Sequence, residues 1–534
     1  MPEELAFARK ASGLVRGLSL WDAFGIGLAV IQPIYAIWYS VQVGLGLFPG
    51  GNLIIATLIS AVTCGICAPV VWGILGASMP RSGGEYVFNS RIISPAIAMG
   101  ASFANVIAIT YWNIFISTWI ASPALAILGQ YMGWTGLSNF VATKAGIVLI
   151  TTLCFAMSFL AVAFGMSVFR VIQRPFIIIG IGGPIILAIV LTFCSKASFI
   201  KHWNTQAIKY HSLDYHAFIA AVGRTAGSVM PTTWSWGDTI GLTTGVFYLF
   251  IYAYALVYLS GEVKRPDKTV LKASWMAVLV PTILGLWTFL GLYHIADFQF
   301  LSAAAYNDLF GGVQGYNMPY SSSYMTLSWL ASGSTWIIAL VASLTFALTS
   351  YWLIVVDLLL VPRAMFAWGM DRMGPKWFTD LSPRWASPIK LYGLITIVQI
   401  ILTAAYVFWF QSQLTGLVAG GLQLVSVFLI TGISGVLFAY RKKVKGIWDS
   451  SPYKNWKVAG IPYITIAAVV YVAYILVLLY YAFFDTRTRD ITGKKSIIFV
   501  VVWALGIAWY YIWKSRSKKV GVDVAMTYGE LPPE

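Results

Sequence analysis

The sequence predicts an all-α integral membrane protein with twelve transmembrane helices. Of the 534 residues, 59% are hydrophobic and only 10% are charged, and the mean hydropathy is +0.78. A soluble domain carries roughly 25% charged residues, whereas uncharged runs longer than about 18 residues indicate membrane spans. Such runs recur along the whole chain, which excludes soluble enzymes and nucleic-acid-binding proteins.

The spans follow from counting uncharged residues against the roughly 20 that one helix needs to cross the bilayer. Residues 23–80 contain no charged residue or histidine and are long enough for two helices, with a turn at Pro49–Gly51. Residues 391–440 predict a second pair, turning near Gln411–Gln413. Single spans are expected early in 92–143, in 145–169, 175–195, 239–261 and 273–293, late in 309–356, and in 458–484 and 496–513.

The distribution of basic residues predicts the orientation. Twelve spans place both termini on one side of the membrane, and most of the 35 lysine and arginine residues lie in the termini and loops of that side. The positive-inside rule assigns this side to the cytoplasm, so we expect a multi-pass protein of the cytoplasmic membrane with a cytoplasmic N-terminus (residues 1–19) and tail (514–534). Residues 1–17 lack the apolar core of a cleavable signal. The net charge of +16 then reflects topology and attraction to membrane lipid, not to nucleic acid.

No cofactor, metal centre or enzymatic activity is expected. The cysteines lie within or at the edges of spans and are interpreted as packing residues: Cys64, Cys67, Cys154 and Cys194. Three histidines of the long segment 195–238 lack metal-ligand spacing: His202, His211 and His216. A membrane-embedded enzyme would need clustered catalytic groups, and the sequence contains no such pattern.

Three segments on the predicted inner side carry motifs. Residues 80–88 read PRSGGEYVF after the second span, residues 260–275 read SGEVKRPDKTVLKASW after the sixth, and residues 362–393 read PRAMFAWGMDRMGPKWFTDLSPRWASPIKLYG after the eighth. At these three places the chain resembles the amino acid, polyamine and organocation permease family, whose members carry PxxGGxYxY-like, EExKNP-like and RDGxxP-like segments. The matching residues are Pro80, Gly83, Gly84, Tyr86 and Phe88; Glu262, Lys264 and Pro266; and Arg363, Asp371, Gly374, Pro375 and Pro388.

The resemblance implies a fold of the leucine-transporter type. This fold is a 5+5 inverted repeat with helices 1 and 6 broken at mid-membrane, plus two C-terminal helices. The corresponding division is repeat 1 in 20–194, an extracellular loop in 195–238, repeat 2 in 239–440 and helices 11 and 12 in 441–513. Unwound backbone is tolerated at membrane depth only where it lines a cavity or is buried in protein, so the two breaks predict the substrate-binding site.

In the first span, Pro33 predicts the break because it lacks an amide hydrogen and clashes with the preceding turn. Gln32 adds a polar group beside it. The family usually has Gly-x-Gly here, whose N–H groups hold the substrate carboxylate. In this chain Ile31, Gln32 and Pro33 take that place, so ordinary carboxylate capture is not expected.

In the sixth span, the family's FxG element falls on Phe250, Ile251 and Tyr252. Neither Gly nor Pro occurs from Val246 to Ser260, so the sequence by itself predicts a continuous helix there, and the break is implied by the resemblance. The expected substrate-binding residues are Gln32, Pro33, Ile34, Tyr35, Tyr111, Phe250, Ile251, Tyr252, Ala253 and Tyr254.

The coupling ion is left open between sodium and a proton. Thr349 and Ser350, with carbonyls around Gly27 and Val30, resemble a sodium site, although such hydroxyls also bond within their own helix. Asp357 is the only acid inside the hydrocarbon part of span eight; it is either a proton carrier or, as the sequence favours, a structural partner of a basic group. Asp22 is expected to anchor an inner gate.

These observations predict a secondary active transporter of amino acids or related amines. It would work by alternating access, with a small-molecule substrate and co-transported H⁺ or Na⁺ as partners. The alternative is a substrate exchanger, or a transporter of a non-amino-acid solute with the same fold.

Overall fold

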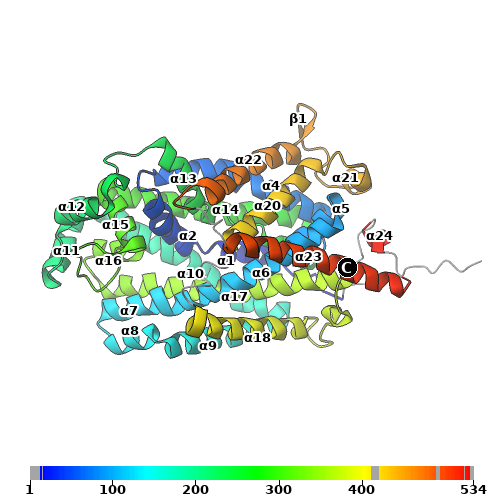
Figure 1. Ribbon diagram of the computed structural model, residues 1–534, viewed down its shortest axis with the longest axis horizontal. Coiled ribbons are helices and arrows are strands. Elements are labelled where there is room, and N and C mark those ends of the chain that lie inside the picture. Colours follow the sequence, from blue (N-terminus) through cyan, green and yellow to red (C-terminus); the bar gives the residue numbers. More distant parts are fainter. Residues whose placement is uncertain (1–12, 15, 411–419, 489–493, 522–523, 529–534) are drawn as a thin grey trace, which may run out of the picture.

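The computed structural model describes residues 13–14, 16–410, 420–488, 494–521 and 524–528. Long helices run side by side along the longest axis of the molecule (Figure 1). Within the described ranges, ten helices are long and apolar enough to cross a membrane, or eleven if the pair Gly421–Leu437 and Lys442–Asp449, bent by 80°, counts as one span. The prediction of an all-α, multi-pass membrane protein is confirmed, and the turn expected at Gln411–Gln413 lies outside the described residues.

The first half of the chain supplies five long spans. The first of them is built from α1 (Leu20–Ile31), α2 (Pro33–Tyr39) and η1 (Ser40–Leu45). The second comprises α3 (Leu53–Ser60), η2 (Ala61–Ile66) and α4 (Cys67–Ser78), and the short helix α5 (Glu85–Ile92) follows it. Next come α6 (Pro95–Trp119), η3 (Ile120–Leu125), α7 (Ala126–Met132), α8 (Thr135–Ala142), α9 (Lys144–Ala163) and α10 (Met166–Phe193).

The second half of the chain also consists mainly of long helices. Its long helices are α14 (Pro266–Ile295), α17 (Trp336–Met370), α18 (Ile389–Ala405) with η9 (Tyr406–Phe410), α20 (Gly420–Leu437), α22 (Tyr463–Phe484) and α23 (Lys494–Lys519). Short elements near the end of the chain are η8 (Lys376–Thr379), η10 (Lys442–Val444), α21 (Lys445–Asp449) and α24 (Val524–Thr527). A small antiparallel hairpin of β1 (Lys457–Val458) and β2 (Ile461–Pro462) pairs Lys457 with Pro462.

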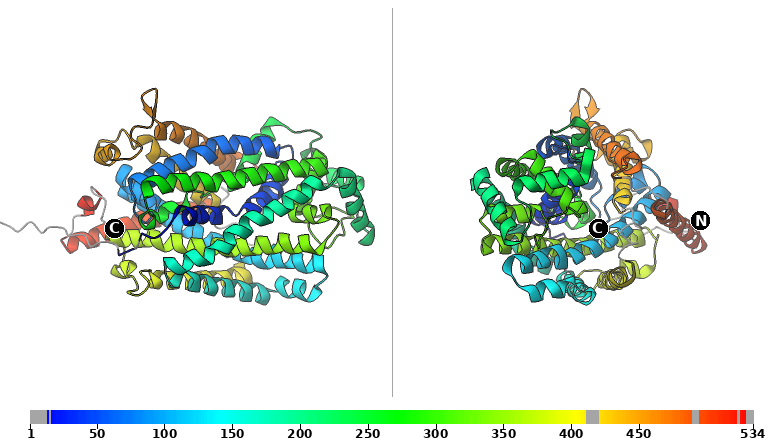
Figure 2. Two further views of the ribbon diagram at one scale, coloured as in Figure 1. Left: turned by 180° about the vertical axis from the view of Figure 1, so that it is seen from behind. Right: turned by 60° about the vertical axis from the view of Figure 1, so that its left-hand side comes forward.

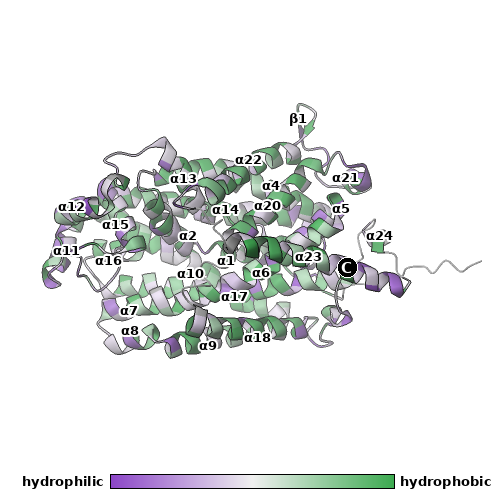
Figure 3. Cartoon of the chain, in the orientation of Figure 1, coloured by the Kyte–Doolittle hydropathy of each residue, from purple (hydrophilic) through white to green (hydrophobic). Residues whose placement is uncertain are grey.

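The connections separate into two groups at opposite ends of the bundle. One end carries α11 (Lys196–Lys209), α12 (Tyr215–Ala226), η4 (Gly227–Val229), α15 (Phe298–Phe310) and α16 (Tyr324–Ala331). The other end carries α5, α21 and α24 (Figure 1), and Figure 2 shows the same arrangement from behind and with the α11 end brought forward. Apolar residues dominate the helices between these ends (Figure 3). The segments 195–238 and 297–333 thus lie at one end, as alternation of the spans requires, and both are largely helical.

The predicted sixth span is not a continuous helix, and that part of the sequence-based prediction is wrong. Helix α13 (Trp236–Val246) ends early, and three short 3-10 turns follow: η5 (Phe247–Leu249), η6 (Ala255–Tyr258) and η7 (Ser260–Glu262). This interruption accounts for one of the spans missing from the predicted twelve; the other contains α20, which is long enough to cross a membrane only together with Lys442–Asp449. The cause of the interruption is tertiary, because side chains from distant helices hold the segment open, as described below.

Candidate substrate-binding site

The first span breaks at Gln32. This residue closes α1 in a left-handed conformation with φ 48° and ψ 81°, and Pro33 opens α2 as its first residue. Proline suits this position because the first helical N–H has no partner in the helix. The Gln32 side chain is fully buried, and neither its amide nitrogen nor its amide oxygen has a hydrogen-bond partner among the described residues. Such a buried, unsatisfied amide costs free energy unless something binds it.

The second break is centred on Tyr252, which also has a positive φ, of 55°. In the described part of the chain, the backbone N–H groups of Tyr252, Ala253 and Tyr254 form no hydrogen bond. A non-glycine residue in this conformation is strained and persists only because its surroundings hold it. Here the hydroxyl of Tyr252 donates a hydrogen bond to the side-chain oxygen of Asn105 on α6. A distant helix therefore fixes a break that no local Gly or Pro predicts.

The two breaks lie against each other. A Cβ atom added to Gly27 of α1 would lie 2.5 Å from the carbonyl oxygen of Ala253 and 2.7 Å from the Cβ atom of Ala277 on α14. Only glycine allows this approach without a shift of the backbone. Gly27 therefore serves as a packing position where α1 meets the second break.

A small cavity of about 30 Å³ lies between the breaks. Its volume is close to that of one water molecule. It is lined by Val30, Ile31, Tyr35, Ile109, Trp112, Tyr248, Ile251, Tyr252, Leu353, Asp357, Leu360 and Leu424. Both interrupted helices, α6, α17 and α20 thus surround one nearly closed space.

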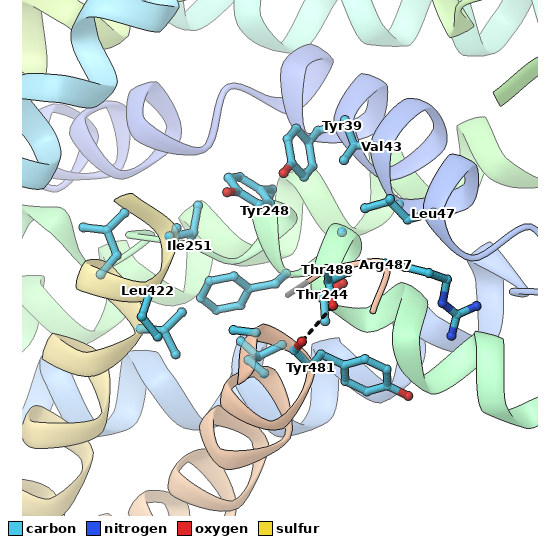
Figure 4. Close-up of a pocket in the computed structure, with 18 residues that line it drawn as sticks. Tyr39, Val43, Leu47, Thr244, Tyr248, Ile251, Leu422, Tyr481, Arg487 and Thr488 are labelled. Atoms are coloured by element: carbon cyan, nitrogen blue, oxygen red, sulfur yellow. Dashed lines mark hydrogen bonds between the residues drawn. The ribbon is translucent and has the colours of Figure 1, made fainter. Parts of the chain in front are cut away.

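A larger cavity of about 350 Å³ adjoins it, sharing Tyr248, Ile251 and Leu424. Figure 4 shows Tyr39 and Val43 of the first span facing Tyr248, with Tyr481 and Thr488 on another side. Arg487 lies at its rim and pairs with Asp238 and Asp485 at 2.8 and 3.1 Å. The volume lies within the range of small-ligand pockets, so the two cavities together form a vestibule and an inner chamber.

Among the described residues that line the inner chamber, Asp357 is the only one with a charged side chain. It is 4% exposed and forms no hydrogen bond or ion pair with another described residue. The favoured interpretation, structural pairing with a basic group, is therefore not seen among the described residues. The nearby Arg363 points elsewhere: it binds Glu262 and the hydroxyl of Tyr392.

Four aromatic residues, Tyr35, Trp112, Tyr248 and Tyr252, form part of the remaining wall, which is otherwise aliphatic. Tyr35 stacks on Trp119 with ring centroids 5.2 Å apart and meets Trp112 and Tyr248 edge-on at 6.5 and 6.2 Å. Trp112 in turn stacks on Tyr248 at 5.9 Å. Faces of such rings attract cations, which adds to the field of the Asp357 carboxylate.

Of the ten expected substrate-binding residues, three line the chamber: Tyr35, Ile251 and Tyr252. Phe250 instead packs against Gly65 of η2, and Tyr254 stacks on Trp72 at 4.4 Å and hydrogen-bonds Tyr471. Tyr111 belongs to a separate cluster with Ile114, Tyr406 and Val407. The remaining members are buried at the breaks without lining the chamber: Gln32, Pro33, Ile34 and Ala253.

Sequence reasoning missed Trp112 and Tyr248. Trp112 follows Tyr111 directly, and one residue turns a helix by about 100°, so the choice between two neighbouring aromatic residues depends on a helix phase that span counting does not give. Tyr248 lies in η5, within a region that the sequence predicts as regular helix.

The candidate coupling residues are placed as follows. The hydroxyl of Thr349 donates to the carbonyl of Thr345 within α17, at 2.7 Å. This is the alternative to a sodium site, in which such a hydroxyl bonds within its own helix. The hydroxyl of Ser350 is buried and has no partner among the described residues. Val30 lines the chamber, whereas Gly27 faces Ala253.

Asp22 lies at the start of α1 and is part of its capping box. Its carboxylate accepts hydrogen bonds from the backbone N–H and the hydroxyl of Ser19, at 2.9 and 2.6 Å. It also accepts from the Gln173 side chain of α10 at 3.2 Å. These bonds fix the helix start and join α1 to α10 at that end of the bundle.

The three motif segments converge at the end opposite α11. Glu262 of the second motif forms an ion pair with Arg363 of the third, and Arg91, just after the first motif, pairs with Asp371 at 2.8 Å. The backbone N–H of Gly83 in the first motif donates to the carbonyl of Tyr258, and Leu18 pairs with Val263. Both ion pairs are buried, so these contacts tie the three motif segments together at that end of the bundle.

Comparison with known proteins identifies the family of the chain. The profile of the family described as Amino acid permease matches residues 18–506. No curated protein matches the chain.

Proposed function

The chain belongs to the amino acid permease family, and on that premise we propose that it moves an amino acid or a related amine across the cytoplasmic membrane by alternating access. The observation that carries this proposal is the chamber between the two broken helices, with the Asp357 carboxylate, which has no partner in the described part of the chain, facing it. An intramembrane carboxylate is costly and marks a substrate or ion pathway.

Asp357 supports a cationic group as the part of the substrate that binds in the chamber. Its charge needs compensation in an apolar setting, and neither Lys, Arg nor His among the described residues lines the chamber. An ammonium group would pair with the carboxylate and lie against Trp112 and Tyr248. A proton would also neutralise the Asp357 carboxylate. Transport coupled to H⁺ is therefore one form of the proposal, and transport coupled to Na⁺ is the other form.

A substrate carboxylate would find few donors at the first break, since Pro33 has none. The unbonded N–H groups of Tyr252 to Tyr254 offer the better place, and the Gln32 amide offers another donor. Because the first break lacks the usual donors, the second candidate function is exchange, or transport of an amine without a carboxylate.

Two features support alternating access. The motif contacts tie the three motif segments together at one end of the bundle, and the 350 Å³ vestibule adjoins the chamber. Both breaks carry a non-glycine residue of positive φ, Gln32 and Tyr252, near the middle of corresponding segments. This correspondence supports an inverted repeat of 20–194 and 239–440, with Trp236–Tyr258 as the interrupted sixth of twelve spans. The excess of Lys and Arg on the side of the termini supports a cytoplasmic location for both.

The test is uptake by purified protein in liposomes. A panel of labelled amino acids and amines is offered under separate sodium and proton gradients, and with unlabelled solute inside to detect exchange. We expect accumulation of at least one cationic or zwitterionic member that is driven by one gradient. Uptake no faster than in empty liposomes across the whole panel would contradict the proposal.

A further inference from the structure

We propose that Glu85 is a proton-binding site outside the substrate chamber and that its protonation state determines where the hydroxyl of Tyr252 points. This inference rests on the proposed transport function, since Tyr252 lines the chamber. Glu85 is the first residue of α5, within the first motif and outside the long spans.

Glu85 is packed tightly against the interrupted segment. Its side chain is fully buried, and a Cβ atom added to the preceding Gly84 would lie 2.7 Å from the ring of Tyr258. Gly84 has a φ of 59°, a conformation that glycine adopts without strain. The motif loop thus places the carboxyl group directly beside Tyr258.

A chain of hydrogen bonds joins Glu85 to the chamber. The hydroxyl of Tyr258 donates to its Oε2 atom, and the Nδ2 atom of Asn105 donates to its Oε1 atom at 3.3 Å. Asn105 also donates to the hydroxyl of Tyr258, and its Oδ1 atom accepts from the hydroxyl of Tyr252. Both bonds to Glu85 therefore use it only as an acceptor, and the bond from Asn105 sets which end of that amide faces Tyr252.

The groups facing Glu85 are neutral. They are Asn105 and Ser102 of α6 and Tyr258 of η6, and Ser102 accepts a bond from Trp368 of α17 at 3.1 Å. The nearest paired cations, Arg91 and Arg363, bind Asp371 and Glu262. On the α20 side, Thr431 and Ser434 bond to Asn89. Tyr252 lies between two acids, since Glu85 and Asp357 both act on it electrostatically.

Burial raises the pKa of Glu85 from 4.5 to about 7, since no cation among the described residues offsets it, and the bonds from Tyr258, Asn105 and Ser102 offset part of the effect. Desolvation disfavours the charged form, while bonds to the carboxylate favour it. Both forms are therefore populated near neutral pH.

The protonated form rearranges these bonds. A neutral carboxyl group carries one O–H donor, which needs an acceptor. The hydroxyls of Ser102 and Tyr258 already accept bonds from Trp368 and Asn105, so we assign this donor to the Asn105 oxygen after the amide turns over. The turned amide then presents its NH₂ group to the hydroxyl of Tyr252, which accepts that bond and directs its own hydrogen into the chamber. One proton is gained at Glu85, no covalent bond other than that O–H changes, and the direction of the whole chain reverses.

This reversal couples proton binding to solute binding. When the hydroxyl of Tyr252 directs its hydrogen into the chamber beside Asp357, the affinity of the chamber for a solute changes. By linkage, binding of that solute changes the proton affinity of Glu85 by the same factor. Glu85 thereby acts as a positioning residue for Tyr252.

The test is a pH titration of the purified protein in lipid vesicles by infrared difference spectroscopy, with protons as the only added ligand. We expect a carboxylic acid C=O band that disappears with a midpoint near pH 7, accompanied by a tyrosine C–O shift that is absent in Tyr252→Phe. In Glu85→Gln both changes should be lost. In Asn105→Ala the carboxyl band should remain while the tyrosine shift no longer follows it.

Two further variants keep the test decisive. Tyr258→Phe removes a bond to the carboxylate and should move the midpoint of the Glu85 titration to higher pH. This variant tests the proposal if Glu85→Gln does not fold.

Asp308→Asn is the matched control, because burial also raises the pKa of Asp308, on α15, to about 6. This variant should leave the Tyr252 shift intact. A tyrosine shift that survives with the same midpoint in Glu85→Gln, or a midpoint unchanged in Tyr258→Phe, would overturn the proposal. The titration needs no substrate, so absence of transport would contradict the proposed function without affecting this result.

Discussion

Arg363 and Glu262 form a buried two-point ion pair, with the Nε and Nη2 atoms of the arginine 2.8 and 3.0 Å from the two carboxylate oxygens. Both side chains are 2% exposed. The pair joins the end of α17 to η7, and the backbone carbonyl of Glu262 also accepts from the N–H groups of Gly17 and Leu18. The start of α1, the interrupted segment and α17 are thus tied at one point.

Breaking this pair is expected to destabilise the protein strongly. Glu262→Gln leaves the buried Arg363 charge unpaired, at a cost of about 3–5 kcal/mol, and the melting temperature in detergent should fall clearly. The double variant Glu262→Gln, Arg363→Met should recover part of the loss. Lys390→Met is the control, because its pair with Asp380 is exposed and such pairs contribute only about 0–1 kcal/mol. Equal melting temperatures for Glu262→Gln and Lys390→Met would contradict this account.

The packing of Gly27 against Ala253 predicts a steric effect on transport. Gly27→Val places two methyl groups on a carbon already 2.5 Å from the Ala253 carbonyl, so the two breaks must separate. We expect uptake to be abolished while the protein still reaches the membrane. Gly182→Ala in α10 is the control, since its added Cβ atom meets nothing within 4 Å. Normal uptake by Gly27→Val would show that the approach of the breaks is not needed.

The positions of two neighbouring aromatic residues give a matched pair of variants. Trp112→Leu removes a ring from the chamber wall and should raise the Michaelis constant about tenfold, consistent with a lost cation–π contact of 1–2 kcal/mol. Tyr111→Leu alters a cluster outside the chamber and should leave the Michaelis constant unchanged. Concentration-dependent uptake measures both, and the reverse order of effects would place the substrate on the other face of α6.

The Glu85 carboxyl predicts how stability varies with pH. Burial raises its pKa in the folded protein to about 7 from 4.5, so the folded state holds the proton more tightly than the unfolded state. The resulting stability is fully present below about pH 4.5 and is lost as the pH rises through 7, on the order of 3 kcal/mol in total. Unfolding of the wild type in detergent should become easier across this window, and Glu85→Gln should flatten the dependence. An equally steep dependence in Glu85→Gln would show that another group is responsible.

The sequence predicted the features that depend on local chemistry. Uncharged runs and basic loops are enough to predict the membrane class, and the missing N–H of Pro33 predicts the break at Gln32. The second break escaped prediction because Val246–Ser260 has no helix breaker. Its conformation depends on bonds from Tyr252 to Asn105 and from Tyr258 to Glu85, which are more than 100 positions away in the chain.

The site residues were also predicted where local chemistry decides their position and missed where tertiary contacts decide it. Tyr35 and Tyr252 were expected at the breaks and line the chamber, whereas Phe250 and Tyr254, on the same short segment, turn toward Gly65 and Trp72. Side-chain direction in an irregular segment does not follow a helical period, so no pattern distinguishes them. The partner expected for Asp357 was also unpredictable, because Arg363 is closer in the chain to Asp357 but pairs with Glu262.

The central claim is that substrate binds beside Asp357 between the two broken helices. The most direct measurement compares uptake by Asp357→Asn with uptake by Asp380→Asn, using whichever panel member the wild type accumulates, over a range of external pH. Asp380→Asn changes an exposed acid and should transport like the wild type, whereas Asp357→Asn should lose uptake at every pH. Uptake by Asp357→Asn at the wild-type rate and with the wild-type pH profile would contradict the claim.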